Sequence, residues 1–387
     1  MEASVFSLDA ATSRERASAI PWYCHAMLIA ATSIIGGLLW DISWHTTIGR
    51  DTFWTPAHMA IYLGGVLAGV SCGFLVLKTT LAGTAEERAS SVRVWGMRGP
   101  LGAWFAIWGA FAMITSAPFD DWWHNAYGLD VKILSPPHVV LALGMMGVIF
   151  GAVLFVLARQ NRGDAGGRWF RGAYVYCAGV LVAMLAILVT EYTFPNNQHG
   201  SLFYIVSCGL FPFALTALGR GSRLRWPATS VAACYMAVML VTAWVLQLFP
   251  ATAKLSPIYN PVDHMVPIGF PLLLVVPAFA LDLIARRLRE RNDWLLAAAM
   301  AAAFVATFFL TQWFFSEFLL SAAADNPIFM GNRVWSYFDR LGSWTHEYWD
   351  AAENPVTVVT IAISFALAFV SARLGLSRGR WMREVVR

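Results

Sequence analysis

Residues 40–58, WDISWHTTIGRDTFWTPAH, form the stretch that decides how this chain folds. It lies between two apolar runs, 22–40 and 56–77, each close to the roughly 20 residues that a membrane-spanning helix needs. Polar and charged residues are therefore concentrated at one turn between two apolar segments. The stretch predicts a helical hairpin with a polar tip.

The sequence contains a second version of this stretch at residues 119–138, FDDWWHNAYGLDVKILSPPH. In each version an Asp stands four residues before a His, and the stretch ends with a polar residue, a Pro and a second His. Residues four apart share one face of a helix, so the Asp and the first His can act together. The residues at these positions are Asp41, His45 and His58 in the first repeat and Asp120, His124 and His138 in the second.

Two imidazoles and a carboxylate that leave further coordination positions of the metal open are typical of a catalytic or redox-active transition-metal site. Ionisable side chains at membrane depth are costly and usually functional, which favours the same interpretation. We therefore predict that each repeat provides metal ligands, and copper, zinc and iron all fit the ligand types. Asp51 and Asp130, two residues after Gly49 and Gly128, are predicted to orient a His ring from outside the ligand set.

The composition excludes a soluble globular protein, since 58% of the residues are hydrophobic, only 13% are charged and 18 are Trp. Only short polar connections separate the apolar runs. Residues 1–387 are therefore predicted to form one all-α, polytopic transmembrane bundle of about ten spans, built from tandem helical hairpins. The predicted spans are 22–40, 56–77, 100–117, 136–157, 170–192, 202–218, 226–248, 265–284, 294–320 and 355–374.

Several of these spans are predicted to begin with a capping residue followed by Pro, where the missing N–H costs nothing. If the Pro is the first helical residue, His58 and His138 are each the third residue of their span, and His264 is the fourth residue of the eighth span. The four predicted starts are Thr55-Pro56, Ser135-Pro136, Asn260-Pro261 and Asn354-Pro355.

The distribution of Lys and Arg predicts the orientation in the membrane. Of the 27 basic residues, 22 fall in the two termini and in the connections on their side. Both termini are therefore predicted to be cytoplasmic in the inner cell membrane, with both repeats toward the outer face. The net charge of +4 is a sum over two opposed faces and does not predict nucleic-acid binding. Residues 1–20 are polar and mixed in charge, so no cleaved signal peptide is expected.

The five Cys residues all fall within predicted helices and form no CxxC or CxxCH motif. This pattern excludes covalent c-type haem and a thiolate zinc cage, and it favours small packing residues. The segment 323–354, by contrast, is rich in aromatic and charged residues. We predict that it is either an interfacial helix on the membrane surface or a lid over a site.

The spacing Asp41-x3-His45-x12-His58, with Arg-Asp-Thr at 50–52, resembles the copper-binding motif in the wholly helical subunit of the copper membrane monooxygenases, the particulate methane and ammonia monooxygenases. The resemblance implies these three residues as copper ligands. It also implies a subunit that works with two further subunits to hydroxylate methane, ammonia or short alkanes. The chain differs in having more spans, in its one-residue-longer second repeat, and in Leu129 at the position equivalent to the Arg.

Three functions remain open from the sequence. The first is a copper-dependent oxidoreductase, a monooxygenase-like subunit acting on a small apolar substrate or ammonia with partner subunits. The second is a storage or transport protein for copper or zinc. The third is a b-type haem protein that exchanges electrons with quinol, which the motif favours least because its His residues all lie at one end of the spans. The predicted partners are the lipid bilayer and further membrane subunits.

Overall fold

The computed structural model describes residues 20–49, 52–127, 135–163, 166–288, 291–331, 335–339 and 354–387. Within these residues, nine helices are long and apolar enough to cross a membrane. The predicted all-α polytopic bundle is therefore confirmed. The nine spans are α2 (Trp22–Thr47), α3 (Pro56–Ala82), α5 (Leu101–Tyr127), α6 (Pro136–Arg162), α7 (Gly167–Leu188), α9 (Ser201–Gly221), α10 (Pro227–Leu246), α12 (Asp293–Leu319) and α14 (Val358–Glu384).

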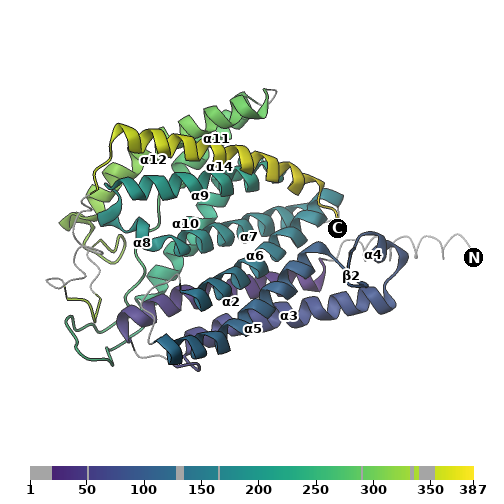
Figure 1. The fold of residues 1–387 in the computed structure, drawn as a ribbon, viewed down its shortest axis with the longest axis horizontal. Helices are drawn as coiled ribbons and strands as arrows, with labels where there is room; N and C mark the ends of the chain where they lie inside the picture. The colour runs from purple at the N-terminus through teal and green to yellow at the C-terminus, as the bar shows by residue number, and fades with distance from the viewer. Residues whose placement is uncertain are drawn as a thin grey trace, which may run out of the picture.

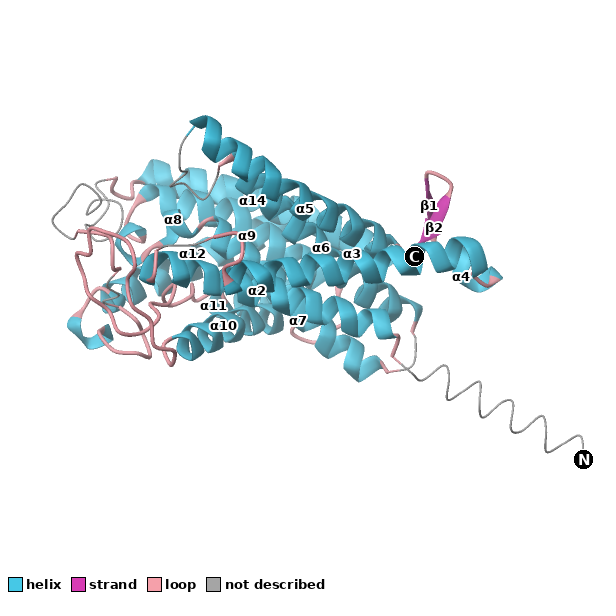
Figure 2. Cartoon of the chain, turned by 90° about the horizontal axis from the view of Figure 1, so that it is seen from below, coloured by secondary structure: helices cyan, strands magenta, loops and turns pink. Residues whose placement is uncertain are grey.

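The spans lie side by side along the long axis of the molecule, and successive spans run in opposite directions, except that α10 and α12 both run toward the same end (Figure 1). The end of the bundle that carries Asp41, His45 and His58 is named the motif end. It also carries α8 (Thr190–Thr193), η1 (Pro195–Asn197) and η2 (Ala322–Ala324). The opposite end carries α4 (Ala85–Ala89), the antiparallel hairpin of β1 (Val92–Val94) and β2 (Met97–Gly99), and the C-terminus (Figures 1 and 2).

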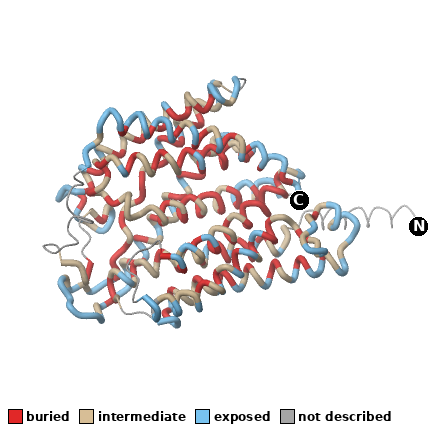
Figure 3. Tube along the Cα trace, viewed as in Figure 1, coloured by how far each residue is buried: buried red, intermediate tan, exposed pale blue. Residues whose placement is uncertain are grey.

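Buried residues follow the helix faces that meet other helices, and exposed residues gather at the periphery of the bundle (Figure 3). The α5–α6 hairpin of the second repeat shows how close this packing is. A Cβ atom on Gly109 would come within 2.5 Å of the carbonyl oxygen of Gly144. Small residues at such crossings allow two membrane helices to approach closely. The five cysteines are all helical, as predicted, and none of them forms a disulfide.

The predicted eighth span, 265–284, is wrong in its first half. Residues 265–273 form neither helix nor strand, and only α11 (Val275–Arg287) is helical. Pro267 and Pro271 lack the N–H donors that a helix requires, and Gly269 has a φ of +108°. The 13 residues of α11 extend for about 20 Å, too short to cross the bilayer alone. Hydropathy could not reveal this, because a buried non-helical segment is as apolar as a span.

Two of the predicted helix starts are also wrong. His264 is not helical, because it lies in the segment that precedes α11. Asn260 does not cap a helix; its side-chain amide donates instead to backbone carbonyls within residues 335–338. Thr357, rather than Asn354, is the N-cap of α14, since its hydroxyl accepts the backbone N–H three residues later.

Candidate metal centre

Asp41 and His45 lie one turn apart near the C-terminal end of α2. Each is preceded by a Trp, and these two Trp residues, Trp40 and Trp44, are themselves one turn apart. The Trp pair packs against an apolar cluster and thereby fixes the rotation of the helix, with the Asp and His on the adjoining face. The cluster consists of Ile48, Leu246, Ala251 and Met265.

His58 is the third residue of α3, as predicted, because Thr55 is the N-cap and Pro56 is the first helical residue. The hydroxyl of Thr55 accepts a hydrogen bond from the N–H of Thr52 at 2.9 Å. The carbonyl oxygen of Thr52 accepts a hydrogen bond from Nδ1 of His58, also at 2.9 Å. A carbonyl oxygen can only accept, so Nδ1 carries the proton and the Nε2 atom is directed to Asp41.

The three side chains of the first repeat converge on one point. Nε2 of His58 lies 3.0 Å from Oδ1 of Asp41, and Nε2 of His45 lies 3.7 Å from Oδ2 of Asp41. One donor atom from each residue lies within 4.8 Å of the other two. A tetrahedral metal with bonds of about 2.0–2.2 Å holds its ligand atoms roughly 3.3 Å apart. The donors therefore need only small movements to fit an ion.

Burial and charge at this point also fit a cation. The Asp41 side chain is only 16% exposed, and its Oδ1 atom accepts no hydrogen bond from any residue that the structure describes. A buried carboxylate is costly unless a positive charge faces it. The side chain of His45, in contrast, is 48% exposed, so the site is accessible from one side.

The second repeat has a similar arrangement in its described part. Asp120 lies on α5, which continues as a helix through Pro118, and His138 is the third residue of α6. Nε2 of His138 lies 3.6 Å from Oδ1 of Asp120, which matches the pairing in the first repeat. His124 follows Asp120 by one helical turn, but its side chain lies outside the described part of the structure, as do the residues Asp51 and Asp130.

Tyr62 links the two repeats, and the sequence motif did not include it. It lies one turn after His58 on α3, and the two rings are 6.4 Å apart. Asp120 and Asp41 both lie within electrostatic range of its hydroxyl group. The hydroxyl of Tyr62 is therefore close to the acidic residues of both repeats. The feature of the sequence that could have identified Tyr62 is its position four residues after His58.

The C-terminal end of α2 is held by two segments from distant parts of the chain, 250–266 and 335–339, which together are named the clamp. The last carbonyl groups of a helix have no partners within the helix. Here they accept hydrogen bonds from the clamp, so the turn that carries His45 is completed by other parts of the chain. These bonds run from Ser336 N to Thr46 O (3.1 Å), from Ser336 Oγ to Thr47 O (2.8 Å) and from Lys254 N to Ile48 O (3.0 Å).

Tyr337 joins the two segments of the clamp to α2. Its hydroxyl donates to the carbonyl of Ile48 and accepts from the N–H groups of Lys254 (2.8 Å) and Leu255 (3.1 Å). Gly49 follows with a φ of +80°, and a Cβ atom there would lie 2.3 Å from the Tyr337 ring. The Gly of the repeat is therefore required by the close approach of this ring. Of the segment 323–354, predicted as a surface helix or lid, residues 335–339 pack against the C-terminal end of α2, and residues 332–334 and 340–353 lie outside the described residues.

The histidines at positions 264 and 199 do not join the first site. His264 is hydrogen-bonded at 2.6 Å to Asp263, an almost fully exposed residue, and this bond holds the pKa of Asp263 below its usual range. His199 lies 3.7 Å from the carboxylate of Glu317. Among the described residues, only Asp41, His45 and His58 form a group of three potential ligands.

No family model, no curated protein and no solved structure matches this chain. The class to which it belongs therefore follows from the chain itself, which has nine apolar spans among the described residues. It is a multi-pass, helical integral membrane protein with a cluster of one carboxylate and two imidazoles at one end of the bundle.

Proposed function

We propose that this protein is an integral membrane metalloprotein that binds copper through Asp41, His45 and His58. The observation that carries the proposal is the convergence of three donor atoms within 4.8 Å at the meeting point of two spans. Three unrelated features of the fold direct these residues to one point: the Trp pair on α2, the turn before α3, and the clamp.

Copper fits this donor set better than the alternatives do. Imidazole nitrogen suits copper, zinc, iron and nickel, and for a given set of nitrogen and oxygen ligands Cu²⁺ binds more tightly than the other divalent first-row metals. The negative charge of Asp41 offsets part of the charge of the ion. Three protein ligands leave positions open for water or a further ligand.

The proposed activity is oxidation of a small apolar substrate or ammonia, together with partner subunits. The support for this activity is the motif that resembles the helical subunit of the copper membrane monooxygenases, together with the open side next to His45. In this activity Asp41 and the two imidazoles hold the ion, while Thr52 keeps the His58 ring in the required tautomer. Copper would supply the redox chemistry.

A second candidate function is storage or transport of copper or zinc. The observation that favours it is the 48% exposure of the His45 side chain, which gives an ion direct access from the surface. The position of the site at the end of the bundle is consistent with delivery of metal to or from an aqueous phase. The b-type haem alternative is not favoured, because the paired His58 and Asp41 lie at the motif end and not across a helical core.

Metal analysis of the purified protein tests this function. The wild type is expected to hold two copper ions and to show no Soret band. Each of the variants His45→Ala and His138→Ala is expected to lose about half of the copper, because each affects one repeat. Loss of all copper in either variant would indicate one shared centre, whereas unchanged copper in both would refute the assignment of the ligands. Rapid exchange with free copper and no substrate oxidation in the presence of co-purifying subunits would favour the transport function.

Membrane orientation provides a second test. A reporter fused after Arg387 is expected to read as cytoplasmic, because the opposite end of the bundle carries most of the basic side chains. A reporter inserted at the exposed residues around Pro257, in the clamp, is expected to read as extracytoplasmic. If both fusions give the reversed result, the site faces the cytoplasm and the function would have to be reconsidered.

A further inference from the structure

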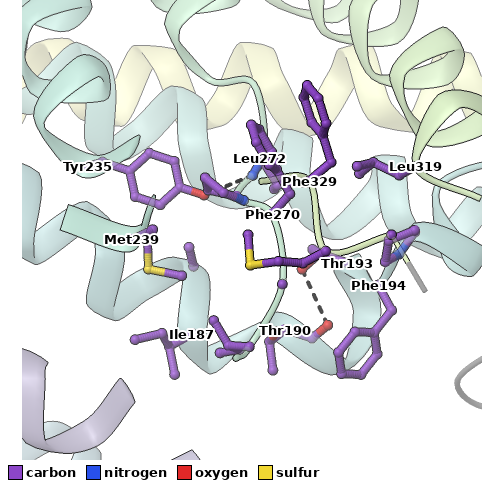
Figure 4. Close-up of a pocket in the computed structure, with 17 residues that line it drawn as sticks. Ile187, Thr190, Thr193, Phe194, Tyr235, Met239, Phe270, Leu272, Leu319 and Phe329 are labelled. Atoms are coloured by element: carbon purple, nitrogen blue, oxygen red, sulfur yellow. Dashed lines mark hydrogen bonds between the residues drawn. The ribbon is translucent and has the colours of Figure 1, made fainter. Parts of the chain in front are cut away.

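A cavity lies between the motif-end halves of α7 and α10 and the non-helical residues 268–272 (Figure 4). Its volume is about 40 Å³. A single water requires roughly 10–15 Å³ on this scale, so the cavity has room for about three groups of that size. It is distinct from the metal centre, since none of Asp41, His45 and His58 lines it.

One wall of the cavity contains main chain without hydrogen-bond partners. Ile268, Gly269 and Phe270 line the cavity, and their N–H groups donate to none of the residues that the structure describes. Non-helical backbone inside a membrane protein is tolerated only where it is buried in protein or lines a cavity whose contents satisfy it. A hydrogen-bonding occupant of the cavity would provide these groups with a partner.

The non-helical conformation of this wall is held by side chains from other parts of the chain. The hydroxyl of Tyr235 accepts from the N–H of Leu272 at 3.1 Å, and Oε1 of Gln312 accepts from the N–H of Leu273 at 3.0 Å. Nε2 of Gln312 donates in turn to Oε1 of Gln198 at 2.7 Å. Tyr235, Gln312 and Gln198 are completely or almost completely buried. Such satisfied buried networks specify one conformation, so the cavity is a built feature and not a packing defect.

The opposite wall determines the chemistry of the occupant. It is formed by apolar side chains such as Ile187 and Met239, together with the hydroxyl-bearing side chains of Thr190 and Thr193, and no charged residue is among the described residues that line the cavity (Figure 4). A charged molecule would lose its hydration there without gaining a partner.

We propose that this cavity is a binding site for a small uncharged molecule of about three non-hydrogen atoms that carries one hydrogen-bonding group, such as a short alcohol. The polar group meets the main chain of residues 268–270 and the hydroxyl of Thr190, and the apolar part lies against Ile187 and Met239. This site does not depend on the metal centre or on the function proposed for it.

Ethanol is the probe for a direct test by saturation-transfer NMR, with the full-length protein in nanodiscs of perdeuterated lipid. The wild type is expected to show saturable binding with a Kd in the millimolar range or weaker, because a ligand of this size cannot bind more tightly. Acetate and ethylammonium, which are similar in size but charged, are expected not to bind.

Three variants connect this signal to the cavity. Ala186→Leu places a larger side chain in the cavity and is expected to abolish the saturable signal. Ala302→Leu makes the same change on the exposed face of α12 and is expected to bind as the wild type does. Thr190→Val removes one hydroxyl without a change in size and is expected to weaken binding several-fold, which keeps the test valid if Ala186→Leu does not fold. Equal binding by the wild type, Ala186→Leu and Thr190→Val would overturn the proposal, as would no saturable binding by the wild type.

Discussion

Asp41→Asn is expected to reduce the metal bound by the first repeat to the background level. Asp41 is the residue that contacts both imidazoles, with its two oxygens 3.0 Å from His58 and 3.7 Å from His45. The amide removes the negative charge that offsets the ion and provides a weaker ligand. We expect the affinity to fall by more than the roughly 10- to 100-fold that is typical of losing an orienting partner. The measurement is a copper titration against a competing chelator.

The matched control for this variant is Asp263→Asn. Asp263 also lies beside a histidine, His264, and its replacement changes the net charge by the same amount, but this pair is exposed and has no third ligand among the described residues. Its copper affinity is expected to equal that of the wild type. The copper affinity of Asp51→Asn, a change between the two histidines of the repeat in the sequence, is expected to lie between those of the other two variants. Retention of full affinity by Asp41→Asn would mean that the carboxylate only pairs with the histidines and binds no metal.

Gly49→Ala is expected to destabilise the protein and to weaken metal binding, although Gly49 itself contacts no ligand. The left-handed backbone at this residue disfavours Ala by about 1–2 kcal/mol. The new methyl group would also displace Tyr337, whose three hydrogen bonds contribute about 0.5–1.5 kcal/mol each. We expect a total loss of about 2–4 kcal/mol, since not all of these bonds are lost. Thermal denaturation and copper titration measure the two effects.

Gly36→Ala is the control, because it makes the same change earlier in the same helical hairpin. A Cβ atom at Gly36 meets nothing within 4 Å, and Ala is a better helix former than Gly. This variant should therefore be as stable as the wild type or slightly more so. If Gly49→Ala has the same melting temperature and copper affinity as Gly36→Ala, the clamp does not support the site.

The parts of the fold that could be predicted from the sequence are those determined by local chemistry. Thr55 and Pro56 fix where α3 begins, and this start alone places His58 in the third helical position. The spacing of Asp41 and His45 fixes their common face once the helix is given. A hairpin has a short connection, so the approach of these three residues follows from the sequence.

The remaining features depend on contacts between distant residues. The prediction of a span over 265–284 did not take Pro267 and Pro271 as a break, because a buried non-helical segment and a span have the same hydropathy. What holds the non-helical chain there is Tyr235 and Gln312, which belong to other helices. The orienting partner of His58 proved to be a backbone carbonyl, that of Thr52, which no side-chain pattern reveals.

The clamp has a consequence for biogenesis. α2 is the first described span to leave the ribosome, yet the hydroxyl that caps its Thr47 carbonyl belongs to Ser336, 289 residues later. A nascent chain can therefore insert α2 and α3 early. The last turn of α2, however, lacks the hydrogen-bond donors of residues 335–339 until almost the whole protein has been translated. We therefore expect the candidate ligands on α2 to reach their final arrangement late in synthesis.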